Sequence, residues 1–451
     1  MNKEKNRIKP IRKKIRDSLS IKLVVLFIMI LFLMIPISSI KTLIRERKAR
    51  RDEAFNEVSS KWGKEQTITG PFLTIPYYKE YEIFNSETKK YDIKKKVQYL
   101  NVLPEKLNFS GKIIPEERYR GIFKVIVYQA EINTKGNFVE PFFSEHGIKD
   151  KDVIWDKAEV SFKISDFRSL QDEVNMIFDE KEYLFSAGYE GKTGISESVK
   201  TSLILDNDKD AWNFDFNLRF DGSSKLFFTP LGEKTKVKLT STWKDPSFAG
   251  NFLPDMRMVS DSGFEANWEV LHLNRPIPQV YKSGLIGEQL LNSYNFGVSL
   301  YIPVDHYQKS ERTVKYALLF IALTFMAFFS TSTINKVNIH PIQYILIGLA
   351  LTIFYSLLLS LSEHISFNLS YWISSLSIIF LLGFYSNAIF KNKKFAMMLS
   401  GIIFVLYGFI FTLIQLQDFA LLVGSIGLFI VVSILMYISL NPSLPPHVVT
   451  A

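Results

Sequence analysis

The stretch LVVLFIMILFLMIPISSI, residues 23–40, decides the class of this protein. It holds 18 residues without one ionised side chain. A helix of that length is about 27 Å long, which matches the hydrocarbon core of a bilayer. The stretch follows nine Lys and Arg residues and ends without a small-residue cleavage motif, so we expect an uncleaved membrane anchor instead of a signal peptide.

Further uncharged runs fill the C-terminal third of the chain. Each is long enough to cross a bilayer, and none carries a charge near its middle. Buried helices of a soluble enzyme seldom follow one another in this way without an amphipathic helix between them. The sequence therefore predicts a polytopic α-helical membrane protein with six transmembrane helices, the first at 23–40 and five more at 316–335, 342–361, 370–390, 395–416 and 419–440.

The basic residues between the predicted spans indicate how the chain is threaded. Lys and Arg occur at 336–341 and 391–394, and they are absent from 362–369 and 415–418. Cytoplasmic loops are enriched in Lys and Arg. We therefore expect a multi-pass membrane protein with both termini in the cytoplasm and residues 41–315 on the outer side of the membrane.

The large segment between the first two spans has the pattern of a β domain. A helix is expected to continue to about residue 61, and residues 66–305 should be mainly antiparallel β-sheet with one face in water. The clearest evidence is an alternation of apolar and polar residues, in which the apolar members are Trp212, Phe214, Phe216, Leu218 and Phe220.

These observations predict a chain in five parts. They are a cytoplasmic basic arm at 1–22, the first span at 23–40, an outer domain at 41–315, a five-helix bundle at 316–440 and a short cytoplasmic tail at 441–451. The net charge of +9 is concentrated before the first span, which favours a topological role over nucleic-acid binding.

Several kinds of site are not expected. The chain has no cysteine, so it can form no disulfide or thiolate metal site. Its six histidines lack close ligand spacing, and phosphate-binding glycine loops are missing. We expect no metal, no cofactor and no catalytic residue set, and we expect the lipid bilayer, with envelope or membrane proteins, as partners.

Five stretches of the sequence are specific in combination: TGPFLTIPY (69–77), DPSFAGNFLPDMRMVSDSGFEANW (245–268), YALLFIALTFMAFF (316–329), HPIQYILIGLAL (340–351) and FYSLLLSLSEHISF (354–367). Together with the arrangement of one span, a large outer domain and five clustered spans, they resemble the CreD family of bacterial inner-membrane proteins. The resemblance implies a multi-pass location in the bacterial inner membrane, with both termini in the cytoplasm and the domain at 41–315 in the periplasm. It also implies a role in cell envelope integrity and colicin tolerance, within the regulon of the CreBC two-component system, and it supplies no catalytic residue set.

The second of these stretches is rich in turn signals, and we expect a long aromatic-rich connection between two strands. A serine nucleophile there would need a base within reach, and the G-x-S-x-G motif is absent. His272 is nearby, but a lone histidine at a strand end is more often structural. The family-like residues of this loop are Phe248, Asn251, Phe252, Pro254, Asp255, Ser260, Gly263, Phe264 and Trp268.

One polar pair stands at the predicted outer end of the third span. Glu363 and His364 put an acid beside a titratable ring, which could sense pH or relay a proton. An interfacial loop wetted by lipid headgroups explains the same pair without a function, and we favour that interpretation.

The sequence thus supports a non-enzymatic envelope protein whose outer β domain contacts envelope components. The alternative is a transporter or flippase-like protein that uses the C-terminal helix bundle. A periplasmic hydrolase is a third hypothesis, and its only candidate nucleophiles are Ser247, Ser260 and Ser262.

Overall fold

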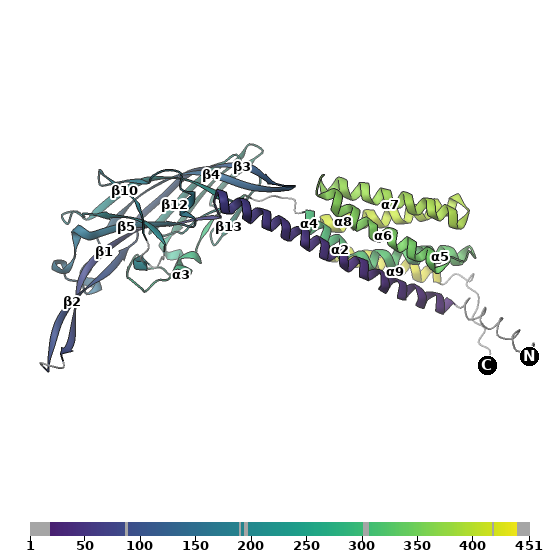
Figure 1. Cartoon of the computed structure of the whole chain (residues 1–451), viewed down its shortest axis with the longest axis horizontal. Coiled ribbons are helices and arrows are strands. Elements are labelled where there is room, and N and C mark those ends of the chain that lie inside the picture. Colours follow the sequence, from purple (N-terminus) through teal and green to yellow (C-terminus); the bar gives the residue numbers. More distant parts are fainter. Residues whose placement is uncertain are drawn as a thin grey trace, which may run out of the picture. The chain divides into compact units, whose positions relative to one another are not determined.

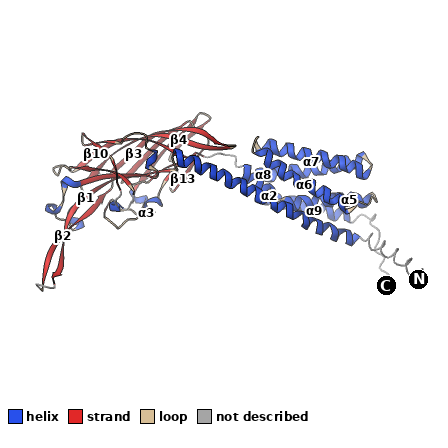
Figure 2. Cartoon of the chain, in the orientation of Figure 1, coloured by secondary structure: helices blue, strands red, loops and turns tan. Residues whose placement is uncertain are grey.

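The computed structural model describes residues 19–85, 89–188, 191–193, 197–300, 306–416 and 419–439. The chain divides into two compact units. The helical unit comprises Met1–Arg51 and Val304–Ala451, and the β unit comprises Asp52–Pro303. Figure 1 labels the elements of each unit, and Figure 2 colours the helices of one and the strands of the other. Most of the predicted basic arm and the whole predicted tail lie outside the described residues.

The helical unit is built from long apolar helices. Five helices of the described chain are long and apolar enough to cross a membrane, whereas the apolar part of α9 is shorter, Ala420–Ile434. The β-rich domain and the polytopic membrane character predicted from the sequence are therefore confirmed, and the count of six spans stays a prediction. The helices are α2 (Leu19–Trp62), α4 (His306–Lys315), α5 (Ala317–Ile334), α6 (Pro341–Ser362), α7 (Phe367–Phe390), α8 (Lys393–Gln415) and α9 (Ala420–Ser439).

Capping residues in the sequence mark where α6 and α8 begin. At α6, the ring of His340 accepts from the Ile342 N–H, and Gln343 accepts the His340 N–H at 2.8 Å. Pro341 occupies the first turn, where its missing N–H has no cost. Asn392 caps α8 by accepting the Lys394 N–H at 2.9 Å. These caps fix the ends of the connections between the spans.

The β unit contains two large sheets. The first has strand order β13-β17-β11-β1-β5-β9-β8, with β2 added to β1 and β16 added to β2, and the second has order β14-β15-β12-β3-β4-β10-β6-β7. Most pairs are antiparallel, as expected, but β1 runs parallel to β11 and β3 runs parallel to β12. The first sheet comprises β1 (Gln66–Asn85), β2 (Lys90–Val102), β5 (Ala158–Ile164), β8 (Ser186–Gly188), β9 (Ser198–Leu203), β11 (Lys225–Phe228), β13 (Pro246–Gly250), β16 (Val280–Lys282) and β17 (Phe296–Leu300).

The second sheet and the short helices complete the unit. Its strands are β3 (Lys106–Arg120), β4 (Phe123–Val139), β6 (Asn175–Phe178), β7 (Lys181–Leu184), β10 (Ala211–Ser223), β12 (Lys234–Ser241), β14 (Met256–Ser260) and β15 (Gly263–Leu271). The short helices are η1 (Phe143–His146), η2 (Asp150–Asp152), η3 (Trp155–Lys157), η4 (Phe167–Ser169), η5 (Gly191–Thr193), η6 (His272–Asn274) and α3 (Glu288–Asn292).

The hydrophobic core of the β unit lies between the two sheets. The predicted alternation in β10 places Trp212 and Phe216 inside, at 1% and 2% exposure. Phe216 stacks on Phe162 of the first sheet with ring centroids 5.3 Å apart, and Phe109 of β3 meets Phe228 of β11 at 4.9 Å. Aromatic rings of both sheets therefore interdigitate, and each sheet buries one face.

Candidate functional site

A polar cluster at one end of the helical unit centres on Glu363, which follows the last residue of α6. Its side chain is only 7% exposed. The hydroxyl of Tyr307, in α4, donates to Glu363 Oε1 at 3.0 Å, and the Nε atom of Arg47, in α2, lies 3.6 Å from the same oxygen. A carboxylate at a helix C-terminus opposes the helix dipole, so the arginine supplies the compensating charge.

Two further contacts complete this cluster. The guanidinium of Arg51 lies over the ring of Tyr307, 5.6 Å from its centroid, and the ring of His306 lies 4.1 Å from that of Tyr307. Burial raises the pKa of Tyr307, and the Glu363 carboxylate raises it further, so the phenol stays protonated and donates its hydrogen. We call Arg47, Arg51, Tyr307 and Glu363 the polar clamp.

The sequence of α4 explains how Tyr307 reaches the cluster. Its buried residues, Tyr307, Ser310, Thr313 and Val314, recur at helical spacing on one face. On the same short helix, Lys309 donates to Gln415 at 3.3 Å, and Gln415 donates to Asn368 at 2.7 Å. The helix that carries Tyr307 is thereby also hydrogen-bonded to the end of α8, which in turn bonds to the start of α7.

The structure separates the two members of the predicted polar pair. Glu363 points into the clamp, whereas His364 is exposed and its described hydrogen bond is a backbone bond to Leu361 at 3.0 Å. Whether either residue has a function stays a prediction. Sequence reasoning missed Arg47 and Tyr307 as partners. The spacing of Arg47 and Arg51 by one helical turn was the available signal, but the run of basic residues around them concealed it.

The family-like loop at 245–268 forms part of the β sheets. The sequence predicted one long connection, but the structure has two short strands in it, β13 in the first sheet and β14 in the second. The segment therefore passes from one sheet to the other. The alternation of Phe264, Ala266 and Trp268 with polar residues indicates a strand after the Ser262-Gly263 turn, and it matches β15, which pairs with both β14 and β12.

The aromatic residues of this loop pack between the sheets. Phe248 meets the rings of Phe264 and Trp268 edge-on, each at 5.7 Å. Phe252 meets Phe296 of β17 at the same separation, and Trp268 lies 5.9 Å from Phe296. These contacts join a β13–β17 pair of one sheet to β15 of the other, so the family-like aromatic residues have a packing role that accounts for their positions.

The polar residues of the loop hold its turns. Asn251 hydrogen-bonds to the backbone at Asn295 and Ser293, and Asp255 accepts the Glu269 N–H at 2.7 Å, just after Pro254. Gly263 has φ of +134°, and a Cβ there would lie 2.0 Å from the Ser241 carbonyl oxygen. Each of these residues therefore serves the local backbone.

Ser260 has no base beside it among the described residues. Its Oγ lies 2.8 Å from that of Ser262 and 3.3 Å from the Gly263 carbonyl oxygen. In the same described ranges, no group of three His, Cys, Asp or Glu side chains is placed to hold a metal ion.

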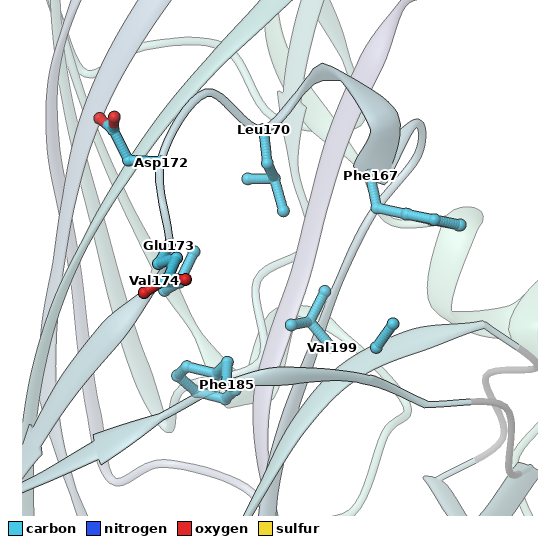
Figure 3. A pocket seen from close by; sticks show the side chains of 8 residues that line it. Phe167, Leu170, Asp172, Glu173, Val174, Phe185 and Val199 are labelled. Carbon is cyan, nitrogen blue, oxygen red and sulfur yellow. The ribbon is translucent and has the colours of Figure 1, made fainter.

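One pocket of about 170 Å³ opens in the β unit (Figure 3). Leu170, Phe185 and Val199 gather around it, and the carboxylate of Asp172 points away from them. Asp172 pairs with Arg219 at 3.3 Å. Because polar groups do not converge on the pocket, its described lining is mainly apolar and does not place side chains for catalysis.

Comparisons with known proteins agree with the resemblance read from the sequence. The family described as "Inner membrane protein CreD" matches residues 18–442. Inner membrane protein CreD of Escherichia coli (strain K12) is 31% identical over 426 residues, covering 93% of this chain and 92% of that protein. Among solved structures, an M1 zinc metallopeptidase from Deinococcus radiodurans has 8% identity over 44% of this chain and 42% of its own. Its TM-score of 0.19 is too low to indicate a shared fold. The chain belongs to the CreD family, and its apolar helices make it a multi-pass protein of the inner membrane.

Proposed function

We propose that this protein supports the integrity of the cell envelope without being an enzyme. As the family resemblance implies, it would act in stress or colicin tolerance, within the regulon of the CreBC two-component system. The observation that carries the mechanism is the polar clamp. It joins the two chain segments that connect the helical unit to the β unit, α2 before it and α4 after it.

The clamp suits a protein that transmits force or position between its parts. A partner that pulls on the β unit pulls on α2 at residue 52 and, through the segment before it, on α4. Glu363 ties both helices to α6 at one point, so the bundle resists their separation. Leaving a buried acceptor or donor unpaired costs about 1–3 kcal/mol, and more for a charged group. Loss of Glu363 should therefore release both segments together.

The orientation that this role requires has both termini in the cytoplasm and the β unit in the periplasm. It is supported by the distribution of Lys and Arg between the spans, which favours cytoplasmic loops at 336–341 and 391–394. The β unit would then meet envelope components, and the bilayer would surround the apolar helices.

The experiment compares two sets of variants in a strain that lacks this protein. Glu363→Ala should lose protection against envelope stress at unchanged membrane abundance, and His364→Ala, its exposed neighbour, should protect like the wild type. The triple variant Ser247→Ala, Ser260→Ala, Ser262→Ala should also protect fully, because the proposal assigns these hydroxyls no chemistry. Loss of protection in a correctly folded triple variant would favour the hydrolase hypothesis instead.

A transporter or flippase-like protein is the second candidate. It is favoured by hydroxyl groups inside the bundle: Tyr355, Tyr371 and Tyr407 come from three helices and are buried. In the described bundle, the hydroxyl of Tyr407 has no hydrogen-bond partner, while that of Tyr371 donates to the Tyr407 carbonyl at 2.7 Å. Reconstituted protein that scrambles a fluorescent phospholipid, and loses this activity in Tyr407→Phe, would support the second candidate over the first.

A further inference from the structure

Two strands of the β unit extend beyond their sheet as a ribbon. β1 and β2 pair in register from Leu73 with Val102 to Asn85 with Lys90. β5 covers β1 only as far as Thr74, and β16 covers β2 only from Leu100 onward. Beyond a single bridge at Tyr77, the described chain pairs residues 78–85 only with residues 90–97. We call these two segments the arm, and Figure 1 shows it projecting at the label β2.

The register sorts the side chains of the arm onto two faces. Directly paired residues lie on the same face, and neighbours along a strand lie on opposite faces. One face, which we call the basic face, carries four lysines and a single carboxylate. Its members are Lys79, Tyr81, Ile83, Lys90, Asp92, Lys94 and Lys96.

The lysines of the basic face differ from the lysines of β12 in whether a carboxylate lies nearby. On β12, Lys234 and Lys236 reach Glu269 at 2.7 and 3.3 Å, and Lys238 reaches Glu265 at 2.8 Å. On the basic face, Lys90, Lys94 and Lys96 have no carboxylate oxygen within 4.0 Å in the described chain. Positive charge is therefore balanced locally on β12 and left unbalanced on the arm.

One cross-strand pair of lysines destabilises the arm. Lys79 and Lys96 are direct cross-strand partners, and like charges in that position destabilise a sheet. Lys79 also lies over the ring of Tyr81, 5.3 Å from its centroid, and the side chain of Ile83 is 48% exposed. An arrangement with this cost is expected where an anion from outside supplies the missing charge.

Lysines on unpaired strands also prevent edge-to-edge aggregation. That task needs charge along the edges and does not require the lysines to share one face. On the opposite face, direct pairing puts Glu80 beside Lys95, and the two are bridged at 3.4 Å; Glu82 adds a second carboxylate, so that face has no excess of positive charge. Protection from aggregation therefore does not explain the sorting.

We propose that the basic face docks on the anionic headgroup surface of a phospholipid bilayer. Eight residues of strand extend over roughly 26 Å, so the lysines of the basic face are spread along that length. Spread lysines match the many separate charges of a headgroup surface, whereas a single small anion would need them to converge on one point. Lysine with tyrosine and an exposed apolar residue is also the composition of membrane interfaces, and a bilayer always accompanies this protein.

The test uses the full chain held in nanodiscs of phosphatidylcholine, and measures its partition onto added vesicles. We expect binding to vesicles that contain phosphatidylglycerol and none to pure phosphatidylcholine, with binding weakened by salt. The triple variant Lys79→Gln, Lys94→Gln, Lys96→Gln should bind about a hundredfold more weakly, because each lysine near an anionic surface contributes appreciably.

The matched control removes the same charge from β12, as Lys234→Gln, Lys236→Gln, Lys238→Gln, and should bind like the wild type. Because the chain has no cysteine, a dye at Ile83→Cys can report on the basic face and one at Tyr91→Cys on the opposite face. Only the first should enter a less polar environment on binding. Equal loss in both triple variants, a response at Tyr91 alone, or binding of inorganic polyphosphate in place of vesicles would overturn the proposal.

Discussion

At the scale of single residues, the family-like loop gives the sharpest test of local geometry. Gly263→Ala should lower the free energy of unfolding by about 1–3 kcal/mol, because a Cβ at φ of +134° would meet the Ser241 carbonyl oxygen. Gly147 is the matched control, since it has φ of +70° and nothing within 4 Å of its added Cβ. Chemical denaturation should find Gly147→Ala much less costly. Equal effects would mean that close approach is unimportant at Gly263.

A buried carboxyl group in β10 predicts a dependence on pH. Burial raises the pKa of Asp221 above its usual 3.8, although Gln129 and Gln171 donate to it and act in the opposite sense. A carboxyl with a raised folded-state pKa favours folding when protonated, so its contribution is lost as pH rises from 3.8 through the folded-state pKa. Relative to the wild type, Asp221→Asn should gain stability over that window and then level off. A difference that stays constant from low to neutral pH would contradict this.

At the scale of elements, the polar clamp predicts an energetic coupling between α4 and α6. Tyr307→Phe removes the hydrogen bond to Glu363 and should cost about 1 kcal/mol, as should Glu363→Gln through the lost charge. A double-variant cycle uses Glu363→Ala, which does remove the acceptor of the Tyr307 hydroxyl; combined with Tyr307→Phe, the costs should fall short of their sum by about 1 kcal/mol, since the shared contact can be lost only once. Unfolding by detergent titration measures each term. Simple additivity would mean that the contact contributes nothing.

The same elements show what the sequence can predict and what it cannot. The alternation in β10 and the uncharged runs at α5 to α8 are local patterns, and they identified these elements correctly. α4 was missed because its buried residues include Ser310 and Thr313, which do not form an apolar stripe. β13 and β14 were missed because they are five residues each and lie among turn signals.

Contacts between residues far apart in the chain could not be predicted either, because no local sequence pattern marks them. β3 pairs with β12, and β1 with β11, although more than a hundred residues separate the partners in each case. Glu363 was selected as a polar residue at a span end, but its partners Arg47 and Tyr307 lie far away along the chain. A single sequence carries no local trace of such contacts, so His364 was the only neighbour available to the prediction.

At the scale of the whole molecule, the central claim is that one chain carries its β unit on the periplasmic side of a membrane spanned by its helices. The proposed role in the envelope and the contact of the β unit with envelope components both depend on it. Composition alone predicted the separation into a membrane part and a β domain, because charged residues are almost confined to the segment before residue 316. The side on which that segment lies depends on a small number of Lys and Arg residues.

Labelling of single cysteines in intact cells tests this claim most directly, because the natural chain has none. Asn217, exposed in β10, and Lys393, exposed before the apolar part of α8, serve as the two sites. A membrane-impermeant maleimide admitted to the periplasm should react with Asn217→Cys in intact cells and with Lys393→Cys only after lysis. Labelling of both sites in intact cells, or of Lys393→Cys alone, would contradict the account.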